Sequence, residues 1–252
     1  MRIDLNADIG ESFGTYAYGD DGAVLRSVSS ASIAAGFHAG DPSVLRATLR
    51  QAAACGVSVG AHPSFPDRQG FGRRDMHLSS QEAEDIVLYQ VAAVAGVARA
   101  EGLTLAHVKP HGAMYTMAAR DLTLAEAIAR ATHAVDPTLV LFALPESALA
   151  AAGKAIGLRV ALEGFADRAY RPDGTLVPRR EPGAVITSVE EVVTRAMQMA
   201  TDRTVQAVDG STLRIDIDTL CVHGDTPGAA SLAAWLRAGL ASAGVDVRAP
   251  RD

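Results

Sequence analysis

The sequence has few cysteines, few aromatic residues and no excess of positive charge. Only Cys55 and Cys221 occur among its 252 residues, far apart and each within an apolar segment. This spacing excludes the disulfide framework of a small secreted domain, and we expect two buried, reduced thiols. The net charge of −6 disfavours nucleic acid and anionic membranes as partners, because both attract clustered Lys and Arg.

Several sequence signals of other protein classes are also absent. No apolar run approaches the length of a membrane span, and the chain opens on a strand-like segment rather than on a basic stretch followed by an apolar one. We therefore predict a cytoplasmic protein. The sequence contains no helical His-Glu-x-x-His, no Cys-x-x-Cys pair, no Gly-x-Ser-x-Gly elbow and no Walker-type phosphate loop. These absences exclude the standard zinc proteases, serine esterases and P-loop enzymes.

Short β-prone runs alternate with helix-sized segments along the chain, which is the rhythm of an α/β protein. The 48% apolar content supports a well-filled core. We predict seven strands, at 2–7, 32–37, 57–61, 105–109, 139–143, 158–162 and 219–222. About 250 residues is the usual size of one barrel of alternating strands and helices. Because no linker or internal repeat is evident, residues 1–252 are predicted to form a single (β/α) barrel-like domain.

Capping signals mark the starts of the helices, and long insertions interrupt the rhythm. We predict helix starts at Asp41-Pro42, Ser79 with Glu82, Thr123 with Glu126, Ser188 with Glu191, and Thr226-Pro227. Two long connections, 62–78 and 166–182, each follow a strand, where a barrel places its active-site loops. A third insertion, 205–217, predicts a β-hairpin that turns at Asp209-Gly210.

The first strand carries polar residues along one face. Because side chains alternate along a strand, Asp4, Asn6 and Asp8 share the face opposite Ile3 and Leu5. An edge strand with one face in solvent would show the same alternation. The first strand alone leaves both interpretations open.

Histidines follow several of the other predicted strands. His38, His62, His111 and His223 each occur just after an apolar run, within two residues of a Gly or Pro that lets the backbone turn. Any single one would fit a structural histidine, but ligands bind outside the carboxyl ends of parallel strands, where all four are expected to converge. Asp and His in mutual reach serve as general base and acid or as ligands of a divalent metal. A buried Lys109 among them could polarise a carbonyl or stabilise developing negative charge.

Two arginine-rich segments, 67–74 and 167–171, add cations near the expected site. A guanidinium group suits carboxylate or phosphate recognition, which makes Arg168 a candidate anion ligand. The alternative is that Arg168 simply pairs with its neighbour Asp167.

Seven segments in this order resemble the LamB/YcsF family, over nearly the whole chain. They are the stretches at 4–11 (DLNADIGE), 36–41 (GFHAGD), 60–63 (GAHP), 70–74 (GFGRR), 107–112 (HVKPHG), 165–170 (FADRAY) and 222–228 (VHGDTPG). The resemblance implies a barrel-like fold related to glycoside hydrolases and carbohydrate deacetylases. It also implies a 5-oxoprolinase activity, in which this chain works with partner subunits B and C to open 5-oxoproline to glutamate at the expense of ATP.

Opening a lactam by water requires a base, a group that stabilises the oxyanion and a proton donor for the leaving nitrogen. Following the resemblance, we expect Asp8 or Asp41 to act as the base and His38, His62 or His111 to act as the acid. Lys109 would stabilise the oxyanion or a phosphorylated intermediate, and Arg168 would bind the substrate carboxylate. Further substrate contacts are expected from Asn6, His223 and Asp225. By analogy with the deacetylases, Asp8, His62 and His111 could instead hold a divalent metal. Without a phosphate loop, ATP is expected to bind mainly to the partner subunits or at a shared surface.

Two other functions use the same residues. A stand-alone metal-dependent deacetylase or amidase would need neither ATP nor partners. A non-catalytic subunit would bind substrate or act as a scaffold for catalytic partners. The sequence leaves the oligomeric state open, a homo-oligomer included.

Overall fold

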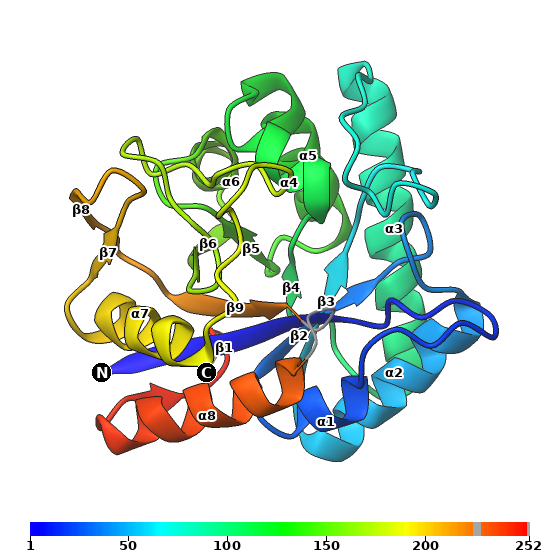
Figure 1. Cartoon of the computed structure of the whole chain (residues 1–252). Coiled ribbons are helices and arrows are strands. Elements are labelled where there is room, and N and C mark those ends of the chain that lie inside the picture. The colour runs from blue at the N-terminus through cyan, green and yellow to red at the C-terminus, as the bar shows by residue number, and fades with distance from the viewer. Residues whose placement is uncertain (224–227, 251–252) are drawn as a thin grey trace.

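The computed structural model spans the whole chain and describes residues 1–223 and 228–250, with only the backbone of His223 described. Within this part, seven parallel strands close into a barrel (Figure 1). They are β1 (Arg2–Ile9), β2 (Ser30–Ala34), β3 (Ser58–His62), β4 (His107–Val108), β5 (Val140–Ala143), β6 (Arg159–Phe165) and β9 (Thr219–His223). Closure comes from β1, which pairs with β2 on one side and with β9 on the other.

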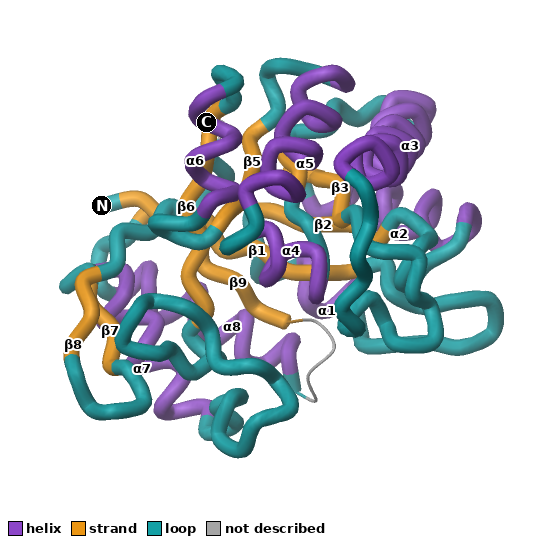
Figure 2. Tube along the Cα trace, turned by 90° about the horizontal axis from the view of Figure 1, so that it is seen from above, coloured by secondary structure: helices purple, strands orange, loops and turns teal. Residues whose placement is uncertain are grey.

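Helices surround the barrel, and Figure 2 shows α2, α3, α5 and α6 outside the ring of strands. The helices are α1 (Asp21–Leu25), α2 (Pro42–Cys55), α3 (Ser80–Ala100), α4 (Gly112–Ala118), α5 (Leu122–Val135), α6 (Ala148–Ala155), α7 (Val189–Thr201) and α8 (Ala229–Ser242). No helix among the described residues has both the length and the apolar character needed to cross a bilayer.

The seven predicted strands are confirmed, and the predicted hairpin is present as antiparallel β7 (Thr204–Gln206) and β8 (Thr212–Arg214). The structure adds a short strand, β10 (Asp246–Val247), beside the start of β1. The second strand was placed too late, at 32–37. It ends at Ala34, because the chain turns at Gly36, whose φ of 94° lies in the left-handed region that glycine favours.

Most of the capping signals are confirmed. The Asp41 carboxylate accepts from the backbone N–H groups of Ser43 and Val44 at the start of α2. Ser79 forms a complete capping box with Glu82 at the start of α3, and Ser188 caps α7.

One capping prediction is wrong, and another lies outside the described residues. Helix α5 begins at Leu122 and is capped by Asp121, so Thr123 is already inside the helix. A carboxylate two residues earlier accepts from the N–H groups of Thr123 and Leu124 and therefore serves as the cap. Thr226 and Pro227 lie outside the part of the chain that the structure describes.

The barrel has an apolar outer face and a polar interior. In β1, Ile3, Leu5, Ala7 and Ile9 join the apolar core with the helices, while the opposite face points into the barrel. Since β1 is paired on both sides, the edge-strand alternative is excluded.

The two cysteines differ in burial. Cys221 in β9 is buried, as expected, but Cys55 is exposed and the prediction of a buried thiol there is wrong. Cys55 is the last residue of α2, beyond the turns whose buried residues face the barrel.

Candidate functional site

The inward-facing residues of β1 begin a column of polar groups through the barrel. At the end of the column nearest the start of β1, which we call its lower end, Asp4 accepts hydrogen bonds from Ser29, Ser30 and Thr219, at 2.7, 2.8 and 2.6 Å. Burial raises the pKa of Asp4 to about 6, although these three hydroxyl donors oppose the shift. Thr219 also accepts a 2.7 Å hydrogen bond from the Asn6 side chain, which links Asp4 to the next layer.

Lys109 forms the centre of the column, just after β4. Its Nζ atom lies 2.9 Å from Asp8 Oδ1 and 2.7 Å from Glu163 Oε1, and it donates to Asn6 Oδ1 and Cys221 Sγ at 3.0 Å each. Burial favours the neutral amine, but Asp8, Cys221 and Glu163 together outweigh it and raise the pKa of Lys109 well above its ordinary value. An ammonium group has three hydrogens, and these four acceptors already surround it. Lys109 therefore holds Asp8 in place, and no hydrogen remains for an oxyanion.

Glu163 is a member of this site that the sequence analysis missed. It is fully buried at the end of β6 and accepts from Asn6 Nδ2 at 3.0 Å as well as pairing with Lys109. The Tyr115 hydroxyl of α4 lies beside it, and burial together with the Glu163 charge raises the pKa of Tyr115. A signal was available, because a carboxylate directly after the apolar run 158–162 and before Gly164 follows the pattern used for the histidines.

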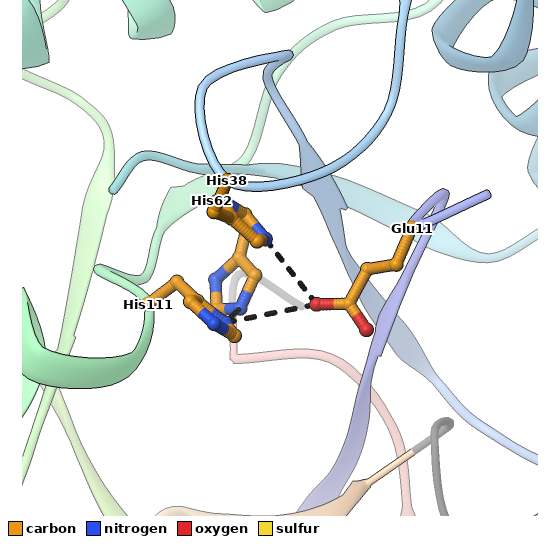
Figure 3. A group of neighbouring side chains, drawn as sticks. All are labelled: Glu11, His38, His62 and His111. Carbon is orange, nitrogen blue, oxygen red and sulfur yellow. Dashed lines mark hydrogen bonds and ion pairs between the residues drawn. The ribbon is translucent and has the colours of Figure 1, made fainter. Parts of the chain in front are cut away.

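Three histidines and one glutamate gather at the mouth of the barrel (Figure 3). We call Glu11, His38, His62 and His111 the mouth cluster. One candidate ligand atom from each lies within 4.8 Å of the others, and all four residues are buried. They come from four segments: the end of β1, the β2–α2 loop, the end of β3 and the start of α4.

The members of the mouth cluster lie close to one another. His111 Nδ1 lies 3.0 Å from His62 Nε2, and Glu11 Oε1 lies 3.3 Å from His38 Nε2 and 3.6 Å from His111 Nδ1. The His38 and His111 rings stack at 3.9 Å. His62 Nε2 also lies 3.4 Å from Asp8 Oδ2, which connects the cluster to the Lys109 layer.

Burial sets the protonation of two members of the cluster. The pKa of His38 lies well below its ordinary value because of burial and the neighbouring His62. Burial, His38 and His62 lower the pKa of His111 in the same way. Both rings are therefore neutral at neutral pH, the form in which one ring nitrogen is free to accept a proton.

The loop after β3 covers the mouth cluster closely. Phe71 packs edge-on against the His38 and His111 rings. Phe71 and Gly72 both have positive φ, 55° and 65°, which is an unfavourable conformation for a phenylalanine. A Cβ on Gly72 would lie 2.3 Å from Ser64 Oγ and 2.9 Å from atoms of both His38 and His111. The loop can approach the histidines this closely only because residue 72 has no side chain.

The structure brings together six of the residues predicted for the site and separates one. The six that converge are Asn6, Asp8, His38, His62, Lys109 and His111. Asp41, the alternative base, is not among them. Its carboxylate is occupied by three backbone N–H groups, those of Ser43 and Val44 at the start of α2 and that of Gly14 in the loop after β1. These bonds lower its pKa and weaken it further as a base.

Arg168 is buried, and it does not pair with Asp167. Its guanidinium group donates to the backbone carbonyls of Ala184 and Val177, and no carboxylate among the described residues forms an ion pair with it. Burial and the nearby Arg179 lower its pKa to about 10. Arg73 acts electrostatically on both Arg168 and His38, which places Arg168 on the same side of the barrel as the mouth cluster.

Two further residues, His223 and Asp225, were predicted as substrate contacts. The backbone of His223 pairs in register with Asp8 across the β1–β9 closure, but its side chain is not described. Asp225 lies outside the described residues.

The residues that could hold a metal differ in part from the predicted set. His62 and His111 were expected as ligands together with Asp8. The geometry adds Glu11 and His38 to the two histidines, while Asp8 lies one layer below with its Oδ1 atom bound to Lys109. Imidazole and carboxylate groups are common ligands of divalent transition metals, so the chemistry of the cluster fits such an ion. His107, by contrast, lies deeper in the barrel, where it contacts Ser32 at 3.1 Å and stacks on Phe142.

Comparison with known proteins identifies close relatives. Residues 3–252 match the model of the LamB/YcsF family. A protein of Tolumonas auensis, described as the A subunit of 5-oxoprolinase, is 54% identical over 98% of this chain and 99% of its own length. A Bacillus subtilis protein of the same description is 51% identical over 99% of this chain and 97% of its own.

Solved structures give the same relationship at the level of the fold. A lactam utilization protein from Thermus thermophilus superimposes with a TM-score of 0.94 at 49% identity, covering 99% of this chain and 100% of that one. A family 4 carbohydrate esterase from Streptomyces lividans superimposes with a TM-score of 0.51 at 13% identity, covering 98% of this chain and 91% of that one. At so low an identity this second likeness concerns the fold alone. It agrees with the predicted relation to carbohydrate deacetylase barrels.

Proposed function

The chain belongs to the LamB/YcsF family, and from this premise we propose that it takes part in the ATP-dependent opening of 5-oxoproline to glutamate within a multi-subunit 5-oxoprolinase. The partners would be the B and C subunits that the family resemblance implies. The observation that supports this most strongly is the mouth cluster, in which proton-transferring groups gather above a fixed and buried pair of charges.

His38 is the member of the cluster best suited to proton transfer. Its Nε2 atom faces Glu11 Oε1, and its buried Nδ1 atom has no hydrogen-bond partner among the described residues. If Nε2 donates to Glu11, then Nδ1 carries a lone pair that can take a proton from an attacking water and pass it to the ring nitrogen. Of the two carboxylates expected as base, Asp41 caps a helix and Asp8 is bound to Lys109 and His62.

Asp8 and Lys109 therefore act as positioning residues for the cluster. His62 Nδ1 donates to the carbonyl of Lys109, and Asp8 Oδ2, fixed through the other oxygen by Lys109, lies 3.4 Å from His62 Nε2. A ring fixed through one nitrogen keeps the orientation that a reaction in a buried site requires.

Arg168 is the proposed ligand of the substrate carboxylate. Among the described residues, the buried guanidinium group of Arg168 donates only to backbone carbonyls, so its charge can still pair with a carboxylate. 5-Oxoproline carries one carboxylate, so a single cation of this kind is sufficient. ATP is proposed to bind to the partner subunits or at a surface shared with them.

Reconstitution with the two partner subunits tests this function. We expect glutamate and ADP only when this chain, both partners, 5-oxoproline and ATP are all present. In the same complex, His38→Gln is expected to lower kcat by about 10²–10⁴, the range that general acid–base catalysis contributes. Arg168→Lys is expected to raise KM for 5-oxoproline more than it changes kcat, because it weakens binding of a group remote from the reacting atoms.

Two outcomes would replace the proposal. Hydrolysis of acetylated sugars or simple amides by this chain alone, without ATP, would indicate a stand-alone deacetylase or amidase. Full activity of the complex with both His38→Gln and Asp8→Asn would indicate a scaffold subunit whose polar interior is structural.

A further inference from the structure

We propose that the mouth of the barrel binds one divalent transition-metal ion through His62 Nε2, His111 Nδ1 and Glu11 Oε1. This site replaces the Asp8, His62 and His111 set expected from the sequence. The proposal stands on the geometry of the three residues and does not depend on the function proposed above.

The outer nitrogens of both histidines are already occupied. His62 Nδ1 lies 2.6 Å from the carbonyl oxygen of Lys109, and His111 Nε2 lies 2.9 Å from the carbonyl oxygen of Phe71. A carbonyl only accepts, so both of these nitrogens must carry the hydrogen. In a neutral imidazole the other nitrogen then has a lone pair, which assigns lone pairs to His62 Nε2 and His111 Nδ1.

These two lone pairs face each other at 3.0 Å. They also face carboxylate oxygens, because Glu11 Oε1 lies 3.6 Å from His111 Nδ1 and Asp8 Oδ2 lies 3.4 Å from His62 Nε2. When both rings are neutral, four acceptor atoms thus converge, and the two histidines supply no hydrogen between them. Acceptors of this kind are stable in a buried position only with a cation among them.

The spacing fits a shared metal ion. The two nitrogens lie 3.0 Å apart. An ion placed about 2.1 Å from each of them, the usual metal–imidazole distance, would make an N–metal–N angle of about 90°. That angle is the one between adjacent ligands in octahedral or five-coordinate geometry. Two nitrogens and a carboxylate on one side would leave the opposite positions for further ligands.

The charge balance of the buried groups points the same way. Among the described residues, Asp4, Asp8, Glu11 and Glu163 are buried carboxylates of the column and its mouth, whereas Lys109 is the buried ammonium that pairs with two of them. These carboxylates outnumber the ammonium even when Asp4, whose pKa is about 6, carries a proton, and a divalent cation would offset the excess. Burying charge without such balance is strongly unfavourable.

In this proposal His38 and Asp8 do not bind the ion but position the residues that do. His38 Nε2 lies 3.3 Å from the same Glu11 oxygen and can donate to it, which orients the carboxylate. Asp8 is fixed by Lys109 and contacts His62. Outer groups of this kind orient ligands and typically change metal affinity by about 10–100-fold when removed.

The test measures metal binding by the full-length chain directly. After removal of metal by a chelator, the protein is titrated with Zn²⁺ by calorimetry and with Co²⁺ by visible absorption, and its metal content is determined by elemental analysis after dialysis. We expect one ion per chain and cobalt d–d bands of the weak intensity that five or six ligands give. His62→Gln, His111→Gln and Glu11→Gln should each weaken binding by at least about 100-fold, whereas His38→Gln should weaken it less.

Two control histidines make the result specific. His77→Gln replaces an exposed histidine of the same covering loop, and His107→Gln replaces a buried one outside the cluster. Both controls should bind Zn²⁺ as the wild type does, and circular dichroism checks that each variant is folded. The proposal is overturned if the wild type takes up no stoichiometric ion, or if the cluster variants bind as the controls do. It is also overturned if nitrogen NMR of the metal-free and metal-treated protein shows a shared proton between His62 and His111 in both.

Discussion

At the scale of single residues, one buried ammonium separates two carboxylates. Lys109 contacts Asp8 and Glu163 within 3.0 Å, and all three side chains are buried. Lys109→Met leaves both carboxylates without their cation and is expected to lower the free energy of unfolding by about 3–5 kcal/mol. Adding Glu163→Gln removes one of the two buried carboxylates that have lost their cation. The double variant should therefore recover at least about 1 kcal/mol of the lost free energy of unfolding.

Urea unfolding followed by circular dichroism, with chelator present so that metal binding does not contribute, measures both variants. A Lys109→Met protein as stable as the wild type, or a double variant less stable than the single one, would contradict the interpretation that Lys109 holds the column together.

The lower end of the column should make stability depend on pH. Asp4 has a pKa of about 6 in the folded protein against 3.8 ordinarily, so the folded state binds its proton more tightly than the unfolded state. Its contribution is therefore fully present below about pH 4 and is lost as the pH rises through about 6. A shift of about two units corresponds to about 3 kcal/mol.

Asp4→Asn removes the titrating group and isolates this effect. The stability of the wild type relative to Asp4→Asn is expected to fall by about 3 kcal/mol between about pH 4 and pH 7.5, as measured by urea unfolding at closely spaced pH values. A difference that stays constant over this range would show that Asp4 titrates alike in the folded and unfolded chain.

The sequence identified the histidines of the site and missed its two glutamates. His38, His62 and His111 stand within two residues of a Gly or Pro just after an apolar run, which predicts a turn at the barrel mouth. Glu11 and Glu163 are equally central, yet glutamate is usually a surface residue, and neither burial nor contact with a distant Lys109 is visible along the chain. Their partners are set by the closure of the barrel, which joins residues far apart in the sequence.

At the scale of secondary-structure elements, the loop after β3 is shaped by its approach to the histidines. Gly72→Ala introduces a Cβ into contact with Ser64, His38 and His111, at a residue with positive φ. Gly102→Ala is the matched control, because Gly102 also has positive φ but nothing lies within 4 Å of its Cβ position. The control should lower the free energy of unfolding by about 1–2 kcal/mol, the cost of a left-handed alanine.

Gly72→Ala should lower the free energy of unfolding by the same backbone cost, and its Cβ should also displace His38 and His111. We expect kcat of the reconstituted enzyme to fall by about 10²-fold, since a displacement of about 1 Å can have that effect, while Gly102→Ala leaves kcat unchanged. Equal kinetic effects of the two substitutions would mean that the loop does not position the cluster.

Two substitutions of Asp41, at the start of α2, can distinguish a helix-capping role from a catalytic role. Asn is as good an N-cap as Asp, so Asp41→Asn should leave both stability and activity close to wild type, whereas Asp41→Ala should lower the free energy of unfolding by about 0.5–2 kcal/mol. Thermal unfolding and the glutamate assay measure both variants. A loss of activity of more than about 100-fold in Asp41→Asn, with stability unchanged, would restore Asp41 as a catalytic residue.

The elements themselves were largely predictable because their signals are local. Short apolar runs predicted the seven barrel strands, and Ser79 with Glu82 predicted the start of α3. The errors occur where a neighbouring residue competes for the same role. Asp121 rather than Thr123 caps α5, and the turn at Gly36 ends β2 earlier than its apolar residues suggest.

At the scale of the whole molecule, the barrel brings together residues that one metal ion would cross-link. Glu11, His62 and His111 follow β1, β3 and β4, so binding holds together a large arc of the closed sheet. An ion that binds only the folded chain stabilises it by about 2.7 kcal/mol at a free concentration about 100 times its Kd. For a protein of this size, about 1 kcal/mol shifts Tm by about 2–4 °C.

Addition of Zn²⁺ to the metal-free chain should therefore raise Tm by about 5–10 °C at that concentration, with a further rise at each higher concentration. His62→Gln should show no rise, and His77→Gln should show the full one, as followed by differential scanning fluorimetry with calorimetry as a check. Cooperative unfolding of the barrel separates all three ligands at once. An ion bound at this site therefore raises the Tm of the whole barrel. A rise of the same size in His62→Gln would instead assign the stabilisation to ions bound elsewhere on the surface.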